Sequence, residues 1–279
     1  MAGSFSNSWA LVKASADVLR LDKELLVFPL LSGVAGVLVM VSFFVPMLVL
    51  GGWPALADME GTYLGYAVAF LFYFVLYTVA FFFNAALVGA ALIRLDGGDP
   101  TISDGLAIAS KRMGAILGYA AIAATVGMLL RAISERSGFL GRIAVGLVGM
   151  AWSLATYLAV PVLVTKDVGP VDAIKESAAL FKRTWGEQVV GNFGMGWAVF
   201  TAVLSWCLFS VLLIVLGAQL SPVGALAAVA VAVAGFVFLA LLASALKGVY
   251  TAALYRYAET GEAGYFDATM VGNAFRPKR

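Results

Sequence analysis

The sequence has no histidine, a single cysteine and few charged residues among its 279 positions. Because Cys207 has no second cysteine to pair with, an intramolecular disulfide is excluded, and the lack of imidazole excludes histidine acid–base chemistry. A cysteine–histidine zinc site is excluded for the same reasons. Phosphate-loop, nucleophile-elbow and zinc-protease motifs are also missing from the sequence. We therefore expect no catalytic residues, no metal and no cofactor.

Charge is scarce in a way that points to a membrane. Charged residues make up 12% of the chain and hydrophobic residues 62%. A soluble domain of ordinary composition carries roughly 25% charged residues. The net charge of +2 is too small to indicate a nucleic-acid partner. The composition therefore predicts an integral membrane protein.

Long apolar runs occur six times along the chain. Each is at least about the 17–20 residues that a helix needs to cross ~30 Å of hydrocarbon. The alternation of a barrel strand is absent, so helices are the way to satisfy the backbone in lipid. We predict an all-α membrane bundle of six transmembrane helices arranged as three hairpins. The predicted spans are residues 25–50, 62–93, 113–130, 143–164, 189–216 and 223–246.

The cations are distributed unevenly between the two sides of these spans. Fifteen of the 18 lie before the first span, after the sixth, or in the connections after the second and fourth. Only Arg131, Arg136 and Arg142 lie on the other side. Since cytoplasmic loops carry an excess of lysine and arginine, this asymmetry predicts that both termini are cytoplasmic.

A short polar segment with helical periodicity precedes the first, third and fifth spans, at residues 8–21, 101–112 and 171–185. In the last of these, Val171, Ile174, Ala178, Phe181 and Trp185 share one face at spacings of three and four. Thr101 and Asp104 fit a capping box at the start of the second. We predict three amphipathic helices in the cytoplasmic interface, each followed by a helical hairpin.

The stretch FKRTWGEQVVGN, residues 181–192, joins the last of these helices to the fifth span. Cations suit the end of a helix and lipid phosphates, and tryptophan suits the membrane interface. We interpret the stretch as the point where the chain enters the membrane. The alternative is a ligand-binding motif in which Arg183, Trp185 and Asn192 contact a ligand head group. The predicted contacts to lipid head groups are Lys111, Arg112, Lys182, Arg183 and Trp185.

Four stretches of the sequence resemble a known family. In order they are SWALVKASADVLRLDKELLVFPLLSG, FFFNAALVGAALIRLDGGDPTISDGL, DAIKESAALFKRTWGEQVVGN and ALYRYAETGEAGYFDATMVGNAF. Together they are similar to a family of bacterial and archaeal integral membrane proteins of unknown function. The resemblance implies one six-span domain and no assigned activity. We divide the chain into an amphipathic segment at 1–24, a bundle at 25–257 and a cytoplasmic tail at 258–279.

A few polar residues leave alternatives open. LDGGDP, residues 95–100, reads as a turn with a helix cap or as a cation-binding loop. Arg131, Glu135 and Arg136 form an ion-paired cluster at a span boundary or a vestibule that attracts anions. Asn84 lies inside the second span, where it either hydrogen-bonds a neighbouring helix or, with Asn192, lines a polar cavity. Pro46 and Pro161 predict bends in the first and fourth spans.

Two functional classes fit these observations. The first is a non-enzymatic organiser or accessory protein of the prokaryotic plasma membrane, contacting anionic head groups on the cytoplasmic side and a membrane-protein partner. The second is a permease or lipid-handling transporter with a cavity between its hairpins. An intramembrane enzyme ranks third, because no acid–base pair lies at membrane depth.

Overall fold

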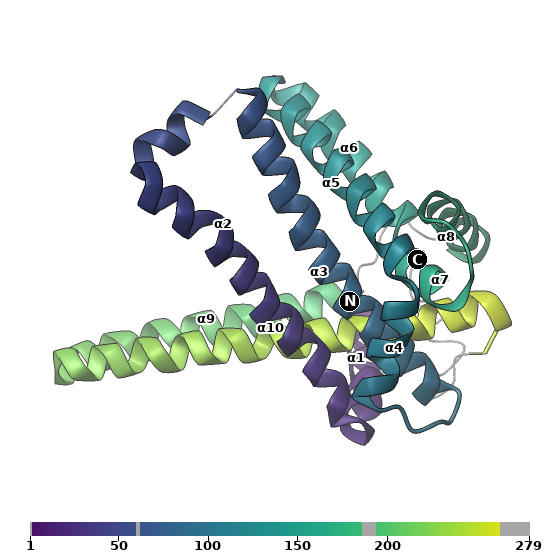
Figure 1. Cartoon of the computed structure of the whole chain (residues 1–279). Coiled ribbons are helices and arrows are strands. Elements are labelled where there is room, and N and C mark those ends of the chain that lie inside the picture. The colour runs from purple at the N-terminus through teal and green to yellow at the C-terminus, as the bar shows by residue number, and fades with distance from the viewer. Residues whose placement is uncertain (1, 60–61, 186–193, 263–279) are drawn as a thin grey trace.

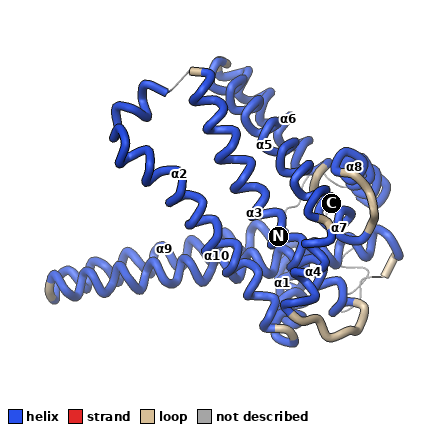
Figure 2. Tube along the Cα trace, in the orientation of Figure 1, coloured by secondary structure: helices blue, strands red, loops and turns tan. Residues whose placement is uncertain are grey.

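The computed structural model describes the backbone of residues 2–59, 62–185 and 194–262, and side chains within 12–49, 62–185 and 199–262. These residues are all-helical, with no strand among them (Figure 2). The elements are α1 (Ala2–Leu21), η1 (Lys23–Leu26), α2 (Val27–Met59), α3 (Tyr63–Leu95), α4 (Ile102–Lys111), α5 (Met113–Arg136), α6 (Phe139–Ala155), α7 (Ala159–Thr165), α8 (Pro170–Trp185), α9 (Gly194–Leu220) and α10 (Pro222–Thr260).

Among the described residues, six helical segments are long and apolar enough to cross a membrane, as the sequence predicts. They are Lys23–Val49, Tyr63–Leu95, Met113–Arg136, Phe139–Thr165, Val199–Leu220 and Pro222–Thr260. Large apolar side chains such as Leu38, Leu147 and Leu208 are exposed along these segments, where a bilayer would cover them. The fold therefore indicates a multi-pass membrane protein.

The long helices contact one another in sequence order, α2 with α3, α5 with α6, and α9 with α10. The α9–α10 pair projects away from the rest of the molecule and runs across the direction of α3 and α5 (Figure 1). It is joined to the other helices through contacts of α10 with α3 and of both helices with α1. Adjacent long helices therefore pair in sequence order, and the α9–α10 pair differs in direction from α3 and α5.

The buried core lies at one end of the molecule, which we call the inner end. It combines the last third of α3, residues 85–95, and the last part of α10, residues 245–258, with α7, α8 and η1. Fully buried large side chains there include Phe28, Leu87, Leu158, Trp185 and Leu254. Burying a side chain of this kind stabilises the fold by about 1.5–3 kcal/mol. The inner end is therefore the most densely packed part of the described chain.

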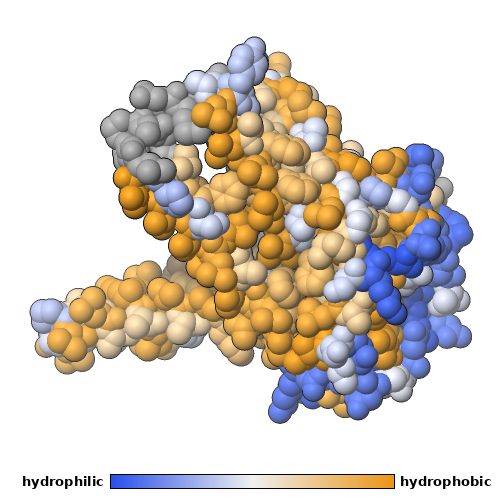
Figure 3. All heavy atoms as spheres, in the orientation of Figure 1, coloured by the Kyte–Doolittle hydropathy of each residue, from blue (hydrophilic) through white to orange (hydrophobic). Residues whose placement is uncertain are grey.

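The three segments predicted to be amphipathic are helices, and each packs against this core. On α1 the buried residues with described side chains are Ser15, Val18 and Leu19, and on α4 the buried residues are Gly105 and Ala109. The capping box between Thr101 and Asp104 is present, with the hydroxyl accepting from the Asp104 N–H. Their polar sides face outward, and hydrophilic surface gathers around this end of the molecule (Figure 3).

The buried side of α8 is rotated relative to the predicted apolar stripe. Val171 is 51% exposed, whereas Ser177 is fully buried beside Ala173, Leu180, Phe181 and Trp185. The reason lies in the fourth span, which is interrupted between α6 and α7 at residues 156–158. Pro161 cannot donate to the carbonyl of Tyr157, and its ring clashes with that carbonyl in a straight helix. The break exposes the N–H of Leu158, which donates to the Ser177 hydroxyl at 2.9 Å.

Glycine allows α4 to approach α3 closely. A Cβ on Gly105 would lie 2.5 Å from the Phe28 ring and 2.7 Å from the Ala86 carbonyl oxygen. Between the two helices, LDGGDP is a turn with a cap, as the first of its two interpretations predicts. Asp96 ends α3, and Gly97 follows in the left-handed region at φ 86°, which favours glycine.

Candidate functional site

Ion pairs connect the loops and helix ends at the inner end. Arg94, in the last turn of α3, donates from Nε and a terminal nitrogen to the Asp22 carboxylate, and also to Asp99. The side chains of Arg94 and Asp22 are only 15% and 7% exposed. A pair this poorly hydrated is held by its hydrogen bonds, and losing one partner leaves a charge uncompensated. Arg94 thus ties η1 to the turn between α3 and α4.

A second cluster joins α7, α8 and α10. Lys166 donates to Glu176 and lies 3.0 Å from Glu259. The hydrogen bond to Glu176, supported by that to Glu259, raises the pKa of Lys166 above its ordinary value of 10.5, although partial burial opposes the shift. The hydroxyls of Thr165 and Tyr255 share a hydrogen bond of 2.7 Å directly beside it. The cluster fixes the end of α10 against the loop before α8.

Other charged residues at the inner end are also paired. Arg112 pairs with Asp167, and Arg256 lies 3.2 Å from Asp96. In the described ranges, no group of three or more histidine, cysteine, aspartate or glutamate side chains is arranged to hold a metal ion. The two aspartates of LDGGDP face Arg94 and Arg256. These ion pairs connect helix ends and loops at the inner end and so stabilise the fold.

The residues predicted to contact lipid head groups have different surroundings in the structure. Lys111 and Lys182 are exposed and make no ion pair with any described residue. Arg112 is half-buried in its pair with Asp167, and Arg183 donates to the Ala258 carbonyl at 2.9 Å. Trp185 is fully buried against Phe181 and Tyr257. The prediction of a lipid-facing Trp185 is therefore wrong, because the residue that ends α8 fills the core.

The two asparagines do not meet in the described structure. Asn84 is exposed on α3, one residue before the buried stretch that begins at Ala85. Within the described ranges, no hydrogen bond reaches its side chain, so the prediction of a helix-to-helix hydrogen bond is wrong there. Asn84 is not among the residues that line the groove between α2, α3 and α5. Asn192 lies outside the described residues.

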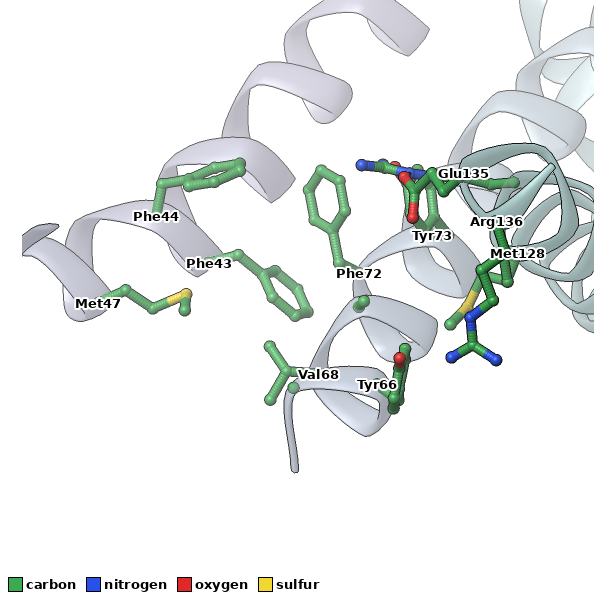
Figure 4. Close-up of a pocket in the computed structure, with 14 residues that line it drawn as sticks. Phe43, Phe44, Met47, Tyr66, Val68, Phe72, Tyr73, Met128, Glu135 and Arg136 are labelled. Atoms are coloured by element: carbon green, nitrogen blue, oxygen red, sulfur yellow. The ribbon is translucent and has the colours of Figure 1, made fainter. Parts of the chain in front are cut away.

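A groove of about 490 Å³ lies at the opposite, outer end, between α2, α3 and α5 (Figure 4). Phe43 and Phe44 of α2 contact Phe72 of α3 edge to face, with 5.4 Å and 5.6 Å between ring centroids, and the three rings line one side of the groove. Its α5 side is charged, with Arg131, Glu135 and Arg136. The other lining residues include Met47, Tyr66, Val68, Tyr73 and Met128. The groove thus has one aromatic wall and one charged wall.

The charged wall contains an internal ion pair. Arg131 donates from Nε to Glu135 at 2.7 Å and from a terminal nitrogen to the Tyr73 hydroxyl at 3.1 Å. Arg136 makes no ion pair with any described residue, so the wall carries a net charge of about +1. The sequence prediction of an ion pair at this span boundary is confirmed. The excess positive charge keeps the alternative of an anion-attracting vestibule open.

Sequence reasoning found the charged wall but not the aromatic one. Phe43 and Phe44 lie in an apolar run in which every residue type suits lipid, and so they give no separate signal. The register that places Phe72 between them depends on how α2 packs against α3. Tyr66, Ala69 and Tyr73 share one face of α3 by their spacing of three and four. That this face meets α5 at Arg131 is known only from the packing of the two helices.

The chain was also compared with known proteins. A model of the Family of unknown function (DUF6159) matches residues 63–265, which include α3 to α10 and thus most of the inner-end core and two of the three helices around the groove. No curated protein matches the chain. No solved structure matches it either.

Proposed function

The chain belongs to this family of unknown function, and we propose that it is a non-enzymatic organiser or accessory protein of the prokaryotic plasma membrane. In this proposal all six apolar segments cross the bilayer and both termini are cytoplasmic. The inner end then contacts anionic lipid head groups and a membrane-protein partner.

The observation that carries the proposal is a filled core surrounded by unpaired cations. The helices α1, α4 and α8 contribute buried apolar side chains to one cluster that also contains Leu158 and Trp185. Five lysines near this core are exposed and make no ion pair with any described residue. They are Lys13, Lys23, Lys111, Lys182 and Lys247. Each lysine near an anionic membrane surface contributes about 1 kcal/mol of attraction.

The spacing of charge along α5 supports this placement in the bilayer. Arg112 and Arg131 bound a stretch without charged residues, and at 1.5 Å per residue they are about 29 Å apart. That distance matches the ~30 Å thickness of the hydrocarbon. The groove beside Arg131 then lies at the outer interface, and the ion pairs around Arg112 at the inner one.

Lipid contact is tested by comparing thermal stability in nanodiscs of phosphatidylglycerol and of phosphatidylcholine. We expect the native protein to melt at a higher temperature in the anionic lipid. A variant with Lys13, Lys23, Lys111 and Lys182 changed to glutamine should lose most of that difference. The control is Arg142→Gln, an exposed cation on the outer side. Equal melting temperatures of the native protein in both lipids contradict the proposal.

Topology is tested with reporter fusions after Leu56, Gly138 and Ser177. We expect an external location for the first two and a cytoplasmic one for the third. A further fusion after Leu220 is decisive, because the α9–α10 pair lies across the other helices (Figure 1). An external signal there supports six spans. A cytoplasmic signal at that site reduces the number of spans to four and refutes this part of the proposal.

A permease or lipid-handling transporter is the second candidate, favoured by the groove between α2, α3 and α5. Transport requires the groove to continue toward the inner end. Reconstituted vesicles that move a fluorescent lipid between leaflets, with the movement lost in Phe72→Trp but not in Arg142→Gln, would replace the organiser hypothesis. An unchanged rate relative to empty vesicles leaves the organiser as the function.

A further inference from the structure

We infer that the outer groove binds one anionic phospholipid, with an acyl chain along the aromatic wall and the phosphate at the charged wall. The site is separate from the inner lysines of the proposed function, but the inference rests on the bilayer placement proposed there. Its volume of about 490 Å³ falls within the usual range for ligand pockets, about 300–1,000 Å³.

The two walls suit the two parts of such a lipid. Phe43, Phe44 and Phe72 offer ring faces and edges, and Met47 adds a flexible thioether that adapts to an irregular chain. None of these four side chains has a group that hydrogen-bonds strongly. An acyl chain therefore packs along this wall without burying a side-chain polar group that needs a hydrogen-bond partner.

Charge complementarity at the opposite wall selects an anion. Arg136 has no ion-pair partner among the described residues, so its guanidinium is free to bind a phosphate through two parallel hydrogen bonds. Arg131 is held by Glu135 and Tyr73, and its position is therefore set before a ligand arrives. Glu135 keeps the net charge low, which suits a phosphodiester of single negative charge. These contacts favour phosphatidylglycerol over the zwitterionic phosphatidylcholine.

The position of the groove relative to the bilayer indicates that its ligand is a membrane lipid. Arg131 marks the outer boundary of the charge-free stretch of α5, where lipid phosphates of the outer leaflet lie. Arg136 lies five residues further outward along α5 than Arg131, about 7.5 Å, whereas Phe72 adjoins Tyr73, whose hydroxyl accepts from Arg131. The aromatic wall at Phe72 therefore lies closer to the middle of the bilayer than Arg136 does. A membrane lipid therefore has its head and its chain at the two depths that the walls require.

The test uses full-length protein in mixed nanodiscs containing either phosphatidylglycerol or phosphatidylcholine with the same diazirine-bearing acyl chain. After illumination, peptides carrying lipid adducts are identified by mass spectrometry. We expect phosphatidylglycerol adducts at Phe43, Met47 or Phe72, several-fold more abundant than phosphatidylcholine adducts. Arg136→Gln should reduce them several-fold, while Arg136→Lys retains part of the signal.

The matched control is Arg142→Gln, which removes the third outer cation without touching the groove. Groove adducts should be unchanged in this variant. The inner-end glutamine variant described above should also leave them unchanged, which separates this site from the proposed function. Equal labelling by the two lipids, or no response to Arg136→Gln in protein of native melting temperature, overturns the inference.

Discussion

At the inner end, helices from distant parts of the described chain contribute to one buried cluster with Phe28, Leu158 and Trp185 and are connected by paired charges. Along α9 and the first part of α10, by contrast, large apolar side chains such as Leu208, Leu212 and Phe238 point outward. The first region stabilises itself with its own contacts, and the second needs lipid around it. Both regions are made of apolar helices, so composition alone does not distinguish them. The two regions differ in how much of each apolar side chain is buried against other residues of the protein.

The largest effect is expected from removing a buried charge at the inner end. Asp22→Ala leaves Arg94 with Asp99 alone, and breaking a buried pair costs about 3–5 kcal/mol. We expect roughly 3 kcal/mol, at the lower end because Asp99 remains. The measurement is thermal or denaturant unfolding in detergent. The exposed Asp17, paired with Arg20 at 3.5 Å, is the control, and its change to alanine should cost less than about 1 kcal/mol.

The next largest loss of stability is expected from a substitution at Gly105, where α4 packs closely on α3. In Gly105→Ala the new methyl group meets the Phe28 ring and the Ala86 carbonyl, and overpacking of this kind costs about 1–3 kcal/mol. Gly114→Ala is the matched control, since nothing lies within 4 Å of a Cβ there. That control should be neutral or stabilising, because alanine favours a helix by about 1 kcal/mol over glycine. Equal melting temperatures for the two variants contradict the described packing of α4 on α3.

Removing the hydrogen bond between Ser177 and Leu158 should have an effect in the same range. Ser177→Ala leaves the Leu158 N–H without an acceptor in a buried position, at a cost of about 1–3 kcal/mol. Ser153→Ala is the control, since that hydroxyl is exposed and bonds only its own helix. Amide hydrogen exchange at Leu158 should accelerate in the first variant alone. An unchanged rate would show that another group accepts this hydrogen bond.

A smaller, pH-dependent effect is expected from Lys166. Its folded-state pKa is raised, so its contribution to stability is complete below the ordinary value of 10.5 and is lost as the pH rises through the higher, folded-state pKa. The melting temperature should therefore fall above about pH 10.5. Tyrosines titrate in the same range, and Lys166→Arg isolates the lysine because arginine stays charged. This variant should show a shallower alkaline decline, and an identical curve contradicts the assignment.

The smallest effect is expected in the α9–α10 pair. Leu212 is 55% exposed, and Leu212→Ala should change the free energy of unfolding by less than about 0.5 kcal/mol in detergent. Leu158→Ala, at a fully buried position, should cost about 2–5 kcal/mol in the same assay. Similar losses for the two variants would remove the distinction between the regions.

Much of the fold follows from local sequence patterns, because span length and helix caps depend on neighbouring residues. The six apolar segments, the three preceding helices and the Thr101–Asp104 capping box were all predictable in this way. The partners of each helix were not. Ser177 is polar and does not belong to the predicted apolar stripe of α8, yet it is buried because the helix break at Leu158, 19 residues upstream, exposes an N–H.

The candidate sites show the same limit. The Arg131–Glu135 pair is four residues apart on one helix and was predictable from spacing alone. Trp185 was assigned to the interface because tryptophan is enriched there, but long-range packing with Tyr257 determines its burial. The aromatic wall of the groove requires α2 and α3 to meet in one register, which no local pattern contains. The features that the sequence did not predict, the burial of Trp185 and the aromatic wall, therefore both depend on contacts between residues far apart in the chain.

The bond between Leu158 and Ser177 has a consequence for the order in which the protein is assembled. Its donor lies 19 residues before its acceptor, so the ribosome completes the fourth span before Ser177 has been added. Hydrocarbon offers no hydrogen-bond acceptor for the Leu158 N–H, and a backbone group without a hydrogen bond costs several kcal/mol in lipid. The fourth span therefore reaches its final hydrogen-bonded state only after α8 has been synthesised, has folded and has docked.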